Sequence, residues 1–127
     1  MKIILSYIFL SFTSSASASE WWYVSDTKDG AINFVDVERY VREGTMAKIW
    51  TYTIFADSHL RLISQKTRDV LNCSTRTIRS TTIVSYRKDG TIGSLSENGV
   101  AEEVAPDTVA EHILRFACAP ALSRPRF

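Results

Sequence analysis

The sequence predicts an α+β fold, in which an antiparallel β-sheet carries one C-terminal helix packed on it and linked to it by a disulfide. Three observations lead to this prediction. Residues 21–95 are rich in β-branched and aromatic side chains and contain two Asp-Gly turn signals, whereas apolar residues at helical spacing follow Pro106. The two cysteines lie one in each part, so a bond between them would join the helix to the sheet.

The N-terminal segment has the pattern of a cleavable secretory signal peptide. Lys2 precedes about ten mostly apolar residues, and the small residues Ala16-Ser17-Ala18 follow, a pattern that signal peptidase cleaves. The alternatives are a buried strand or a membrane anchor, but an anchor needs about 20 apolar residues. We therefore expect a signal peptide (1–18), one domain (19–118) and a flexible tail (119–127), with no transmembrane segment after cleavage.

The start of the domain predicts a β-hairpin followed by a long strand. Residues 21–24 and 31–35 are aromatic and β-branched, and Asp29-Gly30 between them favours a tight turn, because both residue types tolerate positive φ. Residues 46–56 are the longest strand candidate. Apolar residues occupy both of its faces, so we expect it to be central in the sheet or covered by a helix.

Further strands are expected at residues 66–80 and 81–88, both rich in threonine, with a hairpin near Ser80 between them. Asp89-Gly90 repeats the turn signal and leads into a strand at 91–95. Residues 96–105 contain Asn98-Gly99 and several acids, and are expected to form a loop.

The helix is predicted from an apolar stripe at positions i, i+3, i+4, i+7 and i+8, namely Val109, His112, Ile113, Phe116 and Ala117. Asp107 or Thr108 can cap its N-terminus, and Thr108 with Glu111 makes a possible capping box. Pro120 ends the helix, because a proline disfavours helical geometry in the residue before it.

The cysteines are expected to form a structural disulfide. An exported chain with two cysteines usually pairs them, and Cys73–Cys118 is the one pairing available. Its loop of about 45 residues is worth roughly 4 kcal/mol in the chain-entropy model. The alternative is a reactive thiol, which needs a basic partner; His112 lies six residues before Cys118, so the two do not share a helix face.

The charges balance overall but are unevenly distributed. After removal of residues 1–18, 14 Lys and Arg face 14 Asp and Glu, which argues against a nucleic-acid-binding protein. Residues 61–88 hold seven basic residues and one acid, whereas residues 97–111 hold five acids and no base. This pattern predicts either a basic face that attracts polyanions or simply two solvated surfaces. For the first interpretation, the candidate ligand-binding residues are Arg76, Arg79, Arg87 and Lys88, on neighbouring strand candidates and a turn.

The sequence predicts no catalytic, metal or cofactor site. His59 and His112 are too few and too far apart for a zinc site, and the chain has neither a G-x-S-x-G motif nor a glycine-rich phosphate loop. The aromatic residues Trp21, Trp22, Tyr23, Trp50, Tyr52 and Tyr86 could form a stacking or carbohydrate-binding platform. Core and cross-strand packing is the usual role of such residues, and it is the role we expect.

Several motifs together resemble the surface-adhesin E family of small exported bacterial proteins. In order they are Trp22, Phe34-Val35-Asp36, Ile49-Trp50, Ser64-Gln65-Lys66, Asn72-Cys73, Tyr86, Gly90, Pro106 and Cys118. The resemblance covers residues 22–118. The chain departs from the family pattern in three respects: it has no lipid-bearing Cys after the signal, no Trp before Pro106, and Asn72 where an acid usually precedes the Cys.

The resemblance implies a non-enzymatic binding module of the bacterial envelope that contacts host matrix proteins or polyanions. The alternative is a periplasmic housekeeping or structural domain without a host ligand, which the missing lipid-bearing Cys favours. The expected location is the periplasm or the secreted fraction, with cell-surface association as the adhesin-like case.

Overall fold

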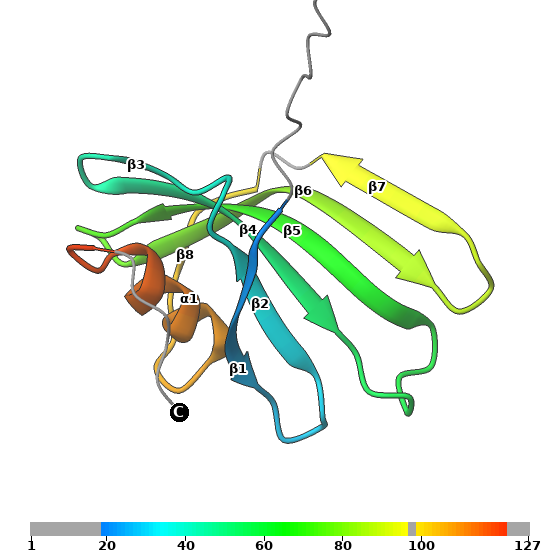
Figure 1. Cartoon of the computed structure of the whole chain (residues 1–127). Coiled ribbons are helices and arrows are strands. Elements are labelled where there is room, and N and C mark those ends of the chain that lie inside the picture. Colours follow the sequence, from blue (N-terminus) through cyan, green and yellow to red (C-terminus); the bar gives the residue numbers. More distant parts are fainter. Residues whose placement is uncertain (1–18, 97–98, 122–127) are drawn as a thin grey trace, which may run out of the picture.

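The computed structural model of the protein describes residues 19–96 and 99–121 (Figure 1). Its elements are β1 (Trp21–Asp26), β2 (Ile32–Asp36), β3 (Val41–Glu43), β4 (Met46–Ile54), β5 (Leu62–Asn72), β6 (Thr77–Arg87), β7 (Ile92–Ser96), β8 (Glu102–Glu103) and α1 (Val109–Ala117). The predicted signal peptide and most of the predicted tail lie outside the described residues.

The strands form one antiparallel sheet in the order β1-β2-β4-β5-β6-β7. The short strand β3 pairs with the start of β4, and β8 pairs with the start of β6. Helix α1 lies at the end of the sheet where β3, β8 and the β5–β6 turn are found (Figure 1). The predicted fold class is therefore confirmed: an antiparallel sheet with one C-terminal helix and a Cys73–Cys118 disulfide.

The two Asp-Gly signals mark hairpin turns as expected. Gly30 and Gly90 adopt φ of +89° and +87°, in the region that favours glycine. The Gly30 amide donates to the Thr27 carbonyl at 3.0 Å, and the Gly90 amide donates to the Arg87 carbonyl at 3.1 Å. Each turn joins strands that are neighbours in the sheet, β1 to β2 and β6 to β7.

The hairpin expected near Ser80 is wrong. Ser80 lies inside β6, where it pairs with Asp69, and the turn between β5 and β6 lies at residues 73–76 instead. Asn72 makes that turn: its Oδ1 accepts hydrogen bonds from the amides of Ser74 (3.0 Å) and Thr75 (3.1 Å). The turn contains no Gly or Pro, so the sequence carried only a weak signal for it. Likewise, the expected loop at 96–105 contains the two-residue strand β8.

Strand β4 is central, as its apolar residues on both faces predicted, and lies between β2 and β5. Ala47, Ile49 and Thr51 are buried on the side of the helix, whereas Trp50 and Tyr52 alternate with them and face the other side. The strands β5 and β6 are longer than β4, with 11 residues each against nine.

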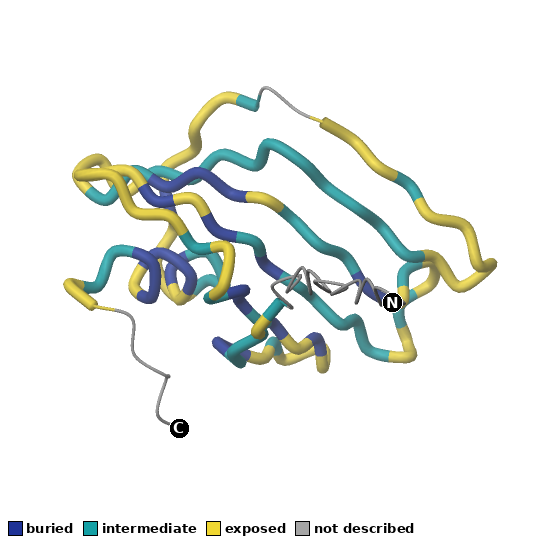
Figure 2. The backbone as a smooth tube through the Cα atoms, turned by 45° about the horizontal axis from the view of Figure 1, so that its top comes forward, coloured by how far each residue is buried: buried dark blue, intermediate teal, exposed yellow. Residues whose placement is uncertain are grey.

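The hydrophobic core lies between α1 and one end of the sheet. Its buried members are Val24, Val35, Ala47, Ile49, Leu71, Val104, Ile113, Leu114, Phe116 and Ala117. Figure 2 shows the buried residues concentrated there, while β7 and the connecting turns are exposed. The predicted helical stripe packs as expected at Ile113, Phe116 and Ala117, and His112 is exposed.

The ends of α1 are fixed by side chains and by the disulfide. Thr108 is the N-cap, and its Oγ1 accepts from the Glu111 amide at 3.3 Å. Glu111 Oε2 accepts in return from the Asp107 amide at 2.8 Å, one residue before the position that a standard capping box uses. At the other end, Cys118 bonds to Cys73, directly after β5, with a Cα–Cα distance of 5.6 Å. The described ranges contain no helix that is long and apolar enough to cross a membrane.

Candidate functional site

The four predicted ligand-binding residues fall at opposite ends of β6. Arg76 and Arg79 lie at its start, and Arg87 and Lys88 at its end. A strand rises about 3.3 Å per residue, so roughly 40 Å of chain separates Arg76 from Lys88. The structure thus brings Arg87 and Lys88 together and separates them from the other pair. The hairpin that joins the two basic strands turns at residues 73–76 and not near Ser80, so it places Arg61 beside Arg87 and Lys88 and leaves Arg76 and Arg79 at the other end.

Arg76 already has an acidic partner within the fold. Its Nη2 lies 3.7 Å from Glu111 Oε1, and Arg115 Nη2 lies 3.1 Å from the same oxygen. The hydrogen bond from the Asp107 amide holds the pKa of the Glu111 carboxyl below its usual value, with further contributions from Arg115 and Arg76. The guanidinium of Arg76 is therefore partly exposed and also pairs with an acid in the first turn of α1.

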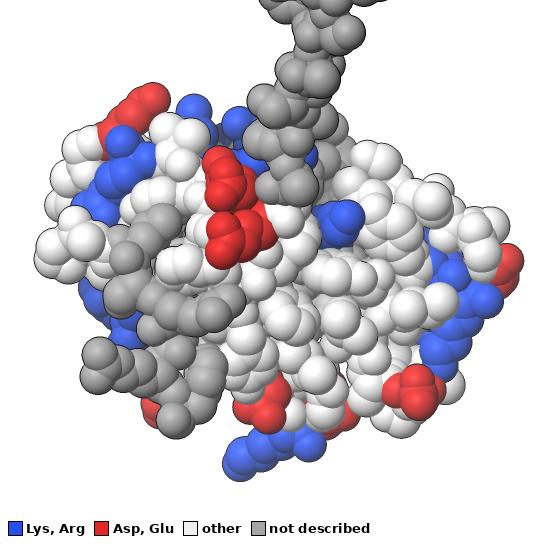
Figure 3. All heavy atoms as spheres, in the orientation of Figure 1, with Lys and Arg blue, Asp and Glu red and all other residues white. Residues whose placement is uncertain are grey.

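Arg87 and Lys88 line a hollow of about 440 Å³ at the end of the sheet far from α1. We call this hollow the basic hollow; its lining residues are Leu60, Arg61, Arg87, Lys88 and Asp89. The β4–β5 loop and the β6–β7 turn form it together, and the Lys88 amide ties them by donating to the Arg61 carbonyl at 3.0 Å. Figure 3 shows a cluster of basic side chains at this right-hand end, flanked by acidic groups.

Local contacts hold the side chains of the basic hollow in place. Lys88 Nζ donates to the Asp57 carbonyl at 2.6 Å, and Arg87 Nη1 donates to Thr91 Oγ1 at 3.3 Å. The Arg87 guanidinium packs on Gly93, where an added Cβ would lie 2.5 Å from Nη2. Any larger residue at position 93 would therefore push the guanidinium away from the strand.

The basic hollow carries excess positive charge. No ion pair within 4.0 Å is formed by Arg61, Arg87 or Lys88 among the described residues. Hydrogen bonds from Thr91 hold the pKa of the Asp89 carboxyl below its usual value, with a smaller contribution from Arg87. This one acid of the lining is therefore ionised, and its Oδ1 accepts hydrogen bonds from the amide and hydroxyl of Thr91 within the same turn. The surface can accordingly attract an anionic group, and guanidinium groups can bind a carboxylate or sulfate through paired hydrogen bonds.

A second distinctive surface is the face of the sheet opposite α1. Five of the six aromatic residues considered from the sequence lie half-buried there: Trp21, Tyr23, Trp50, Tyr52 and Tyr86. Phe34 joins them, with ring centroids 6.1 Å from Tyr23 and 6.2 Å from Tyr52, and Trp21 lies 5.4 Å from Tyr52. The expected core role holds for Trp22, which packs against Phe116 at 6.1 Å. The other five are outside the core, because no helix in the described part of the chain covers their face, but Tyr23 and Tyr52 make cross-strand ring contacts with Phe34 as expected.

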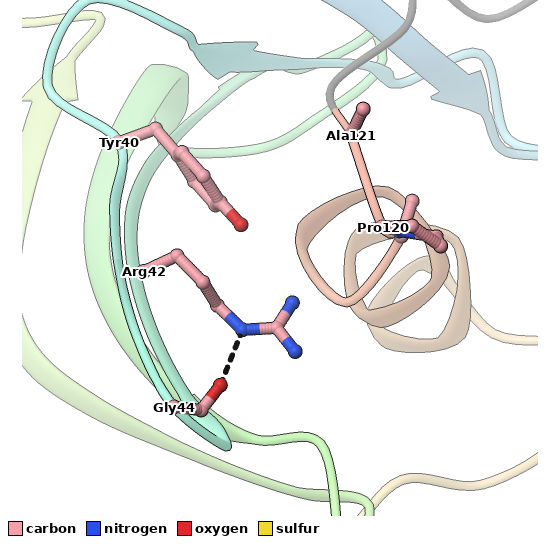
Figure 4. Close-up of a pocket in the computed structure, with 6 residues that line it drawn as sticks. Tyr40, Arg42, Gly44, Pro120 and Ala121 are labelled. Carbon is pink, nitrogen blue, oxygen red and sulfur yellow. Dashed lines mark hydrogen bonds between the residues drawn. The ribbon is translucent and has the colours of Figure 1, made fainter.

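A second hollow, of about 290 Å³, lies between β3 and the residues after α1 (Figure 4). Tyr40 and Arg42 point from the β3 side toward the end of the helix. Both donate to the Ala117 carbonyl, from Tyr40 Oη at 2.5 Å and from Arg42 Nη1 at 3.0 Å, while Arg42 Nε donates to the Gly44 carbonyl at 2.8 Å. These bonds satisfy a carbonyl at the C-terminus of α1, which gives the two side chains a structural role.

Of the two histidines, His59 accepts backbone hydrogen bonds in a loop and His112 is exposed on α1. His59 Nδ1 accepts from the amides of Arg61 (3.2 Å) and Leu62 (3.0 Å), so it organises the β4–β5 loop. Across residues 19–96 and 99–121, no group of three or more His, Cys, Asp or Glu side chains is placed to hold a metal ion.

The fold and these surfaces define a class of protein: a small disulfide-linked sheet domain with one face packed by a helix. Aromatic side chains lie half-buried on its other face, and basic side chains are exposed at one end. A sequence model of the family described as surface-adhesin protein E matches residues 21–119. The chain belongs to this surface-adhesin family, and the resemblance drawn from the order of its motifs is confirmed. Membership marks it as an adhesin-like protein that is exported and associated with the cell surface. No curated protein sequence and no solved structure matches the chain significantly.

Proposed function

We propose that the protein is a non-enzymatic binding module of the bacterial envelope that contacts host matrix proteins or polyanions through the basic hollow. The observation that carries this proposal is the set of three cations, Arg61, Arg87 and Lys88, that gather around one hollow without an ion-pair partner among the described residues. Leu60 beside them is 91% exposed and offers an apolar contact to a protein ligand.

Two features of the hollow support binding rather than simple solvation. The side chains of Arg87 and Lys88 are held by hydrogen bonds to Thr91 and to the Asp57 carbonyl, so less conformational freedom is lost when a ligand arrives. The three cations also come from two separate loops that a backbone hydrogen bond joins. They therefore present a positive surface of fixed shape.

The proposal keeps Arg87 and Lys88 from the four candidates and adds Arg61. Arg76 and Arg79 remain candidates of a separate region at the other end of β6, which the same experiment tests. Attraction between exposed charges is screened over about 8 Å at physiological salt, so binding at either region should weaken as salt rises.

The experiment measures heparin and matrix-protein binding by surface plasmon resonance. In one variant Arg61, Arg87 and Lys88 become Ser; in a second variant of equal charge, which tests the other end of β6, Arg68, Arg76 and Arg79 become Ser. Exposed charge pairs are worth up to about 1 kcal/mol each, so the first variant should lose about tenfold or more in affinity and the second variant much less. Both variants should keep nearly the wild-type melting temperature. Equal losses in the two variants, or no binding by the wild type, would refute the proposed site.

The alternative, a periplasmic housekeeping or structural domain, differs in location. Protease shaving of intact cells separates the two: a surface-exposed module is degraded, whereas a periplasmic domain is protected until the outer membrane is opened. Protection together with absent heparin binding would establish the housekeeping function in place of the proposed one.

A further inference from the structure

A hollow of about 190 Å³ opens on the sheet face opposite α1, and it shares no lining residue with the basic hollow. We call it the aromatic hollow; its lining residues are Ser19, Trp21, Arg39, Trp50, Lys66 and Val84. Residues of β1, β4, β5 and β6 form its floor and Arg39 comes from the β2–β3 connection. We propose that the aromatic hollow binds an acidic monosaccharide unit, such as a uronic or sialic acid, at the end or within the chain of a glycan.

Lys66 is the central group of this site. Its Nζ lies 5.8 Å from the ring centroid of Trp21, 5.4 Å from that of Tyr52 and 5.5 Å from that of Tyr86. Such rings attract a cation through the negative charge of their faces and so hold the half-buried ammonium in position. Among the described residues Lys66 forms no ion pair, and its ammonium makes no hydrogen bond to them. Its three N–H donors are therefore open to a ligand.

Arg39 supplies a second positive group at the edge of the hollow. Its Nη1 forms an ion pair with Asp36 Oδ2 at 3.1 Å and also donates to Ser19 Oγ. Asp36 is fully buried and anchors the guanidinium, whose side chain is 52% exposed. The lining itself contains two cations and no carboxylate. This charge favours an anionic ligand over a neutral one.

The two indole rings at this hollow indicate that the ligand has an apolar face as well as an anionic group. Trp21 and Trp50 line the same hollow, and an indole ring is an apolar surface against which the C–H face of a sugar ring can pack. A carboxylate on that sugar would then reach the ammonium of Lys66 and the guanidinium of Arg39, through charge-assisted hydrogen bonds. An inorganic anion would leave the indoles without a partner, and a neutral sugar would leave the ammonium of Lys66 without an anionic one.

The predicted cleavage after Ala18 strengthens the site. It makes Ser19 the first residue of the mature protein, and Ser19 lines the hollow. An α-amino group at the start of a chain is mostly protonated at and below neutral pH. Processing would thereby add a third cation beside Lys66 and Arg39.

The test uses the mature protein exported from the full chain, with its first residue identified by mass spectrometry. Saturation-transfer NMR and tryptophan fluorescence measure binding of the methyl glycosides of glucuronic acid and of N-acetylneuraminic acid, with methyl glucoside as the neutral control. A charged hydrogen bond is worth about 1.5–3 kcal/mol, so at least one acidic sugar should bind about tenfold or more tightly than the glucoside.

Matched variants then test the residues. Lys66→Gln should lose that preference for the acidic sugar, and Trp50→Ala should weaken binding of both acidic and neutral sugars. Lys48→Gln is the control, because Lys48 is exposed on the same face of β4 and does not line the hollow. The variant with Ser at positions 61, 87 and 88 should bind the sugars normally, which separates this site from the proposed heparin site.

Three outcomes would overturn the inference. They are no saturable binding of either acidic sugar, equal affinity for the neutral glucoside, or full retention of the acidic preference in Lys66→Gln. A concentration-dependent dimer that buries Trp50 and that Trp50→Ala dissociates, found by sedimentation, would assign the aromatic face to a second copy of the chain instead.

Discussion

Replacing Asp69 by Asn should stabilise the protein at neutral pH and remove much of its pH dependence between pH 4 and 6. Asp69 lies on β5 and is only 4% exposed. It accepts hydrogen bonds from Ser80 Oγ at 2.8 Å and Thr51 Oγ1 at 3.4 Å, and no cation lies within 4.0 Å of it in the described part of the chain. Burial raises the pKa of its carboxyl to about 6, and the two hydrogen bonds only partly oppose this effect.

The direction of the effect follows from proton binding. The unfolded chain releases the Asp69 proton near its ordinary pKa of 3.8, whereas the folded protein keeps it until about pH 6. The folded state therefore binds more protons between these values, and the contribution of Asp69 to stability falls as pH rises through that window. A shift of roughly two units corresponds to about 3 kcal/mol, which is an upper estimate of the cost of ionised Asp69 above pH 6.

Asn at this position stays neutral at every pH and keeps the shape of the side chain. We expect Asp69→Asn to raise the free energy of unfolding by up to about 3 kcal/mol at pH 7 and to change it little at pH 4. Urea unfolding of both proteins at pH 4, 5, 6 and 7 measures this. Asp57→Asn is the control, because Asp57 is exposed in the β4–β5 loop. Parallel pH profiles for wild type and Asp69→Asn, or a loss of stability at pH 7, would refute the reasoning.

Two further predictions concern the link between helix and sheet. Reducing the Cys73–Cys118 bond should lower the free energy of unfolding by about 4 kcal/mol, because the bond closes a 45-residue separation in the unfolded chain. Denaturant titration with and without reductant measures the loss, and two titratable thiols in the unfolded, unreduced protein would contradict the prediction. Phe116→Ala should cost about 3–5 kcal/mol, because Phe116 is 7% exposed and packs edge-on against Trp22. His112→Ala, on the exposed side of α1, should change stability by about 0.5 kcal/mol or less. Similar costs for these two substitutions would mean that the packing face of the helix is assigned wrongly.

Features set by short stretches of chain could be read from the sequence. Asp29-Gly30 and Asp89-Gly90 mark tight hairpins because their preference for positive φ is local, and both turns are present. The period of the apolar residues after Pro106 is likewise local, and it identified α1 and the buried residues Ile113, Phe116 and Ala117, although it included the exposed His112 and omitted the buried Leu114. Thr108 and Glu111, three residues apart, are close enough in the chain for the helix cap to be foreseen.

The turn at residues 73–76 shows where local reasoning failed. A threonine-rich run has strong strand propensity throughout, so propensity alone does not say where the chain reverses. The Asn72 side chain makes the turn by bonding to the amides of residues 74 and 75. Placing the hairpin at Ser80 put Arg79 and Arg87 on two neighbouring strands. In the structure both residues lie on β6, near its opposite ends.

Both candidate sites depend on contacts between strands that are distant in the sequence. Alternation along β4 showed that Trp50 and Tyr52 share a face, but it could not show which face the helix would cover. The surroundings of Lys66 come from pairing register, which sets β5 against β4 on one side and β6 on the other. A one-residue change of register would move Lys66 to the other face of the sheet. The sequence could therefore supply the residue types of the aromatic hollow and the basic hollow, whereas their assembly required the sheet, because side chains from strands far apart meet only when the register of every intervening strand is set.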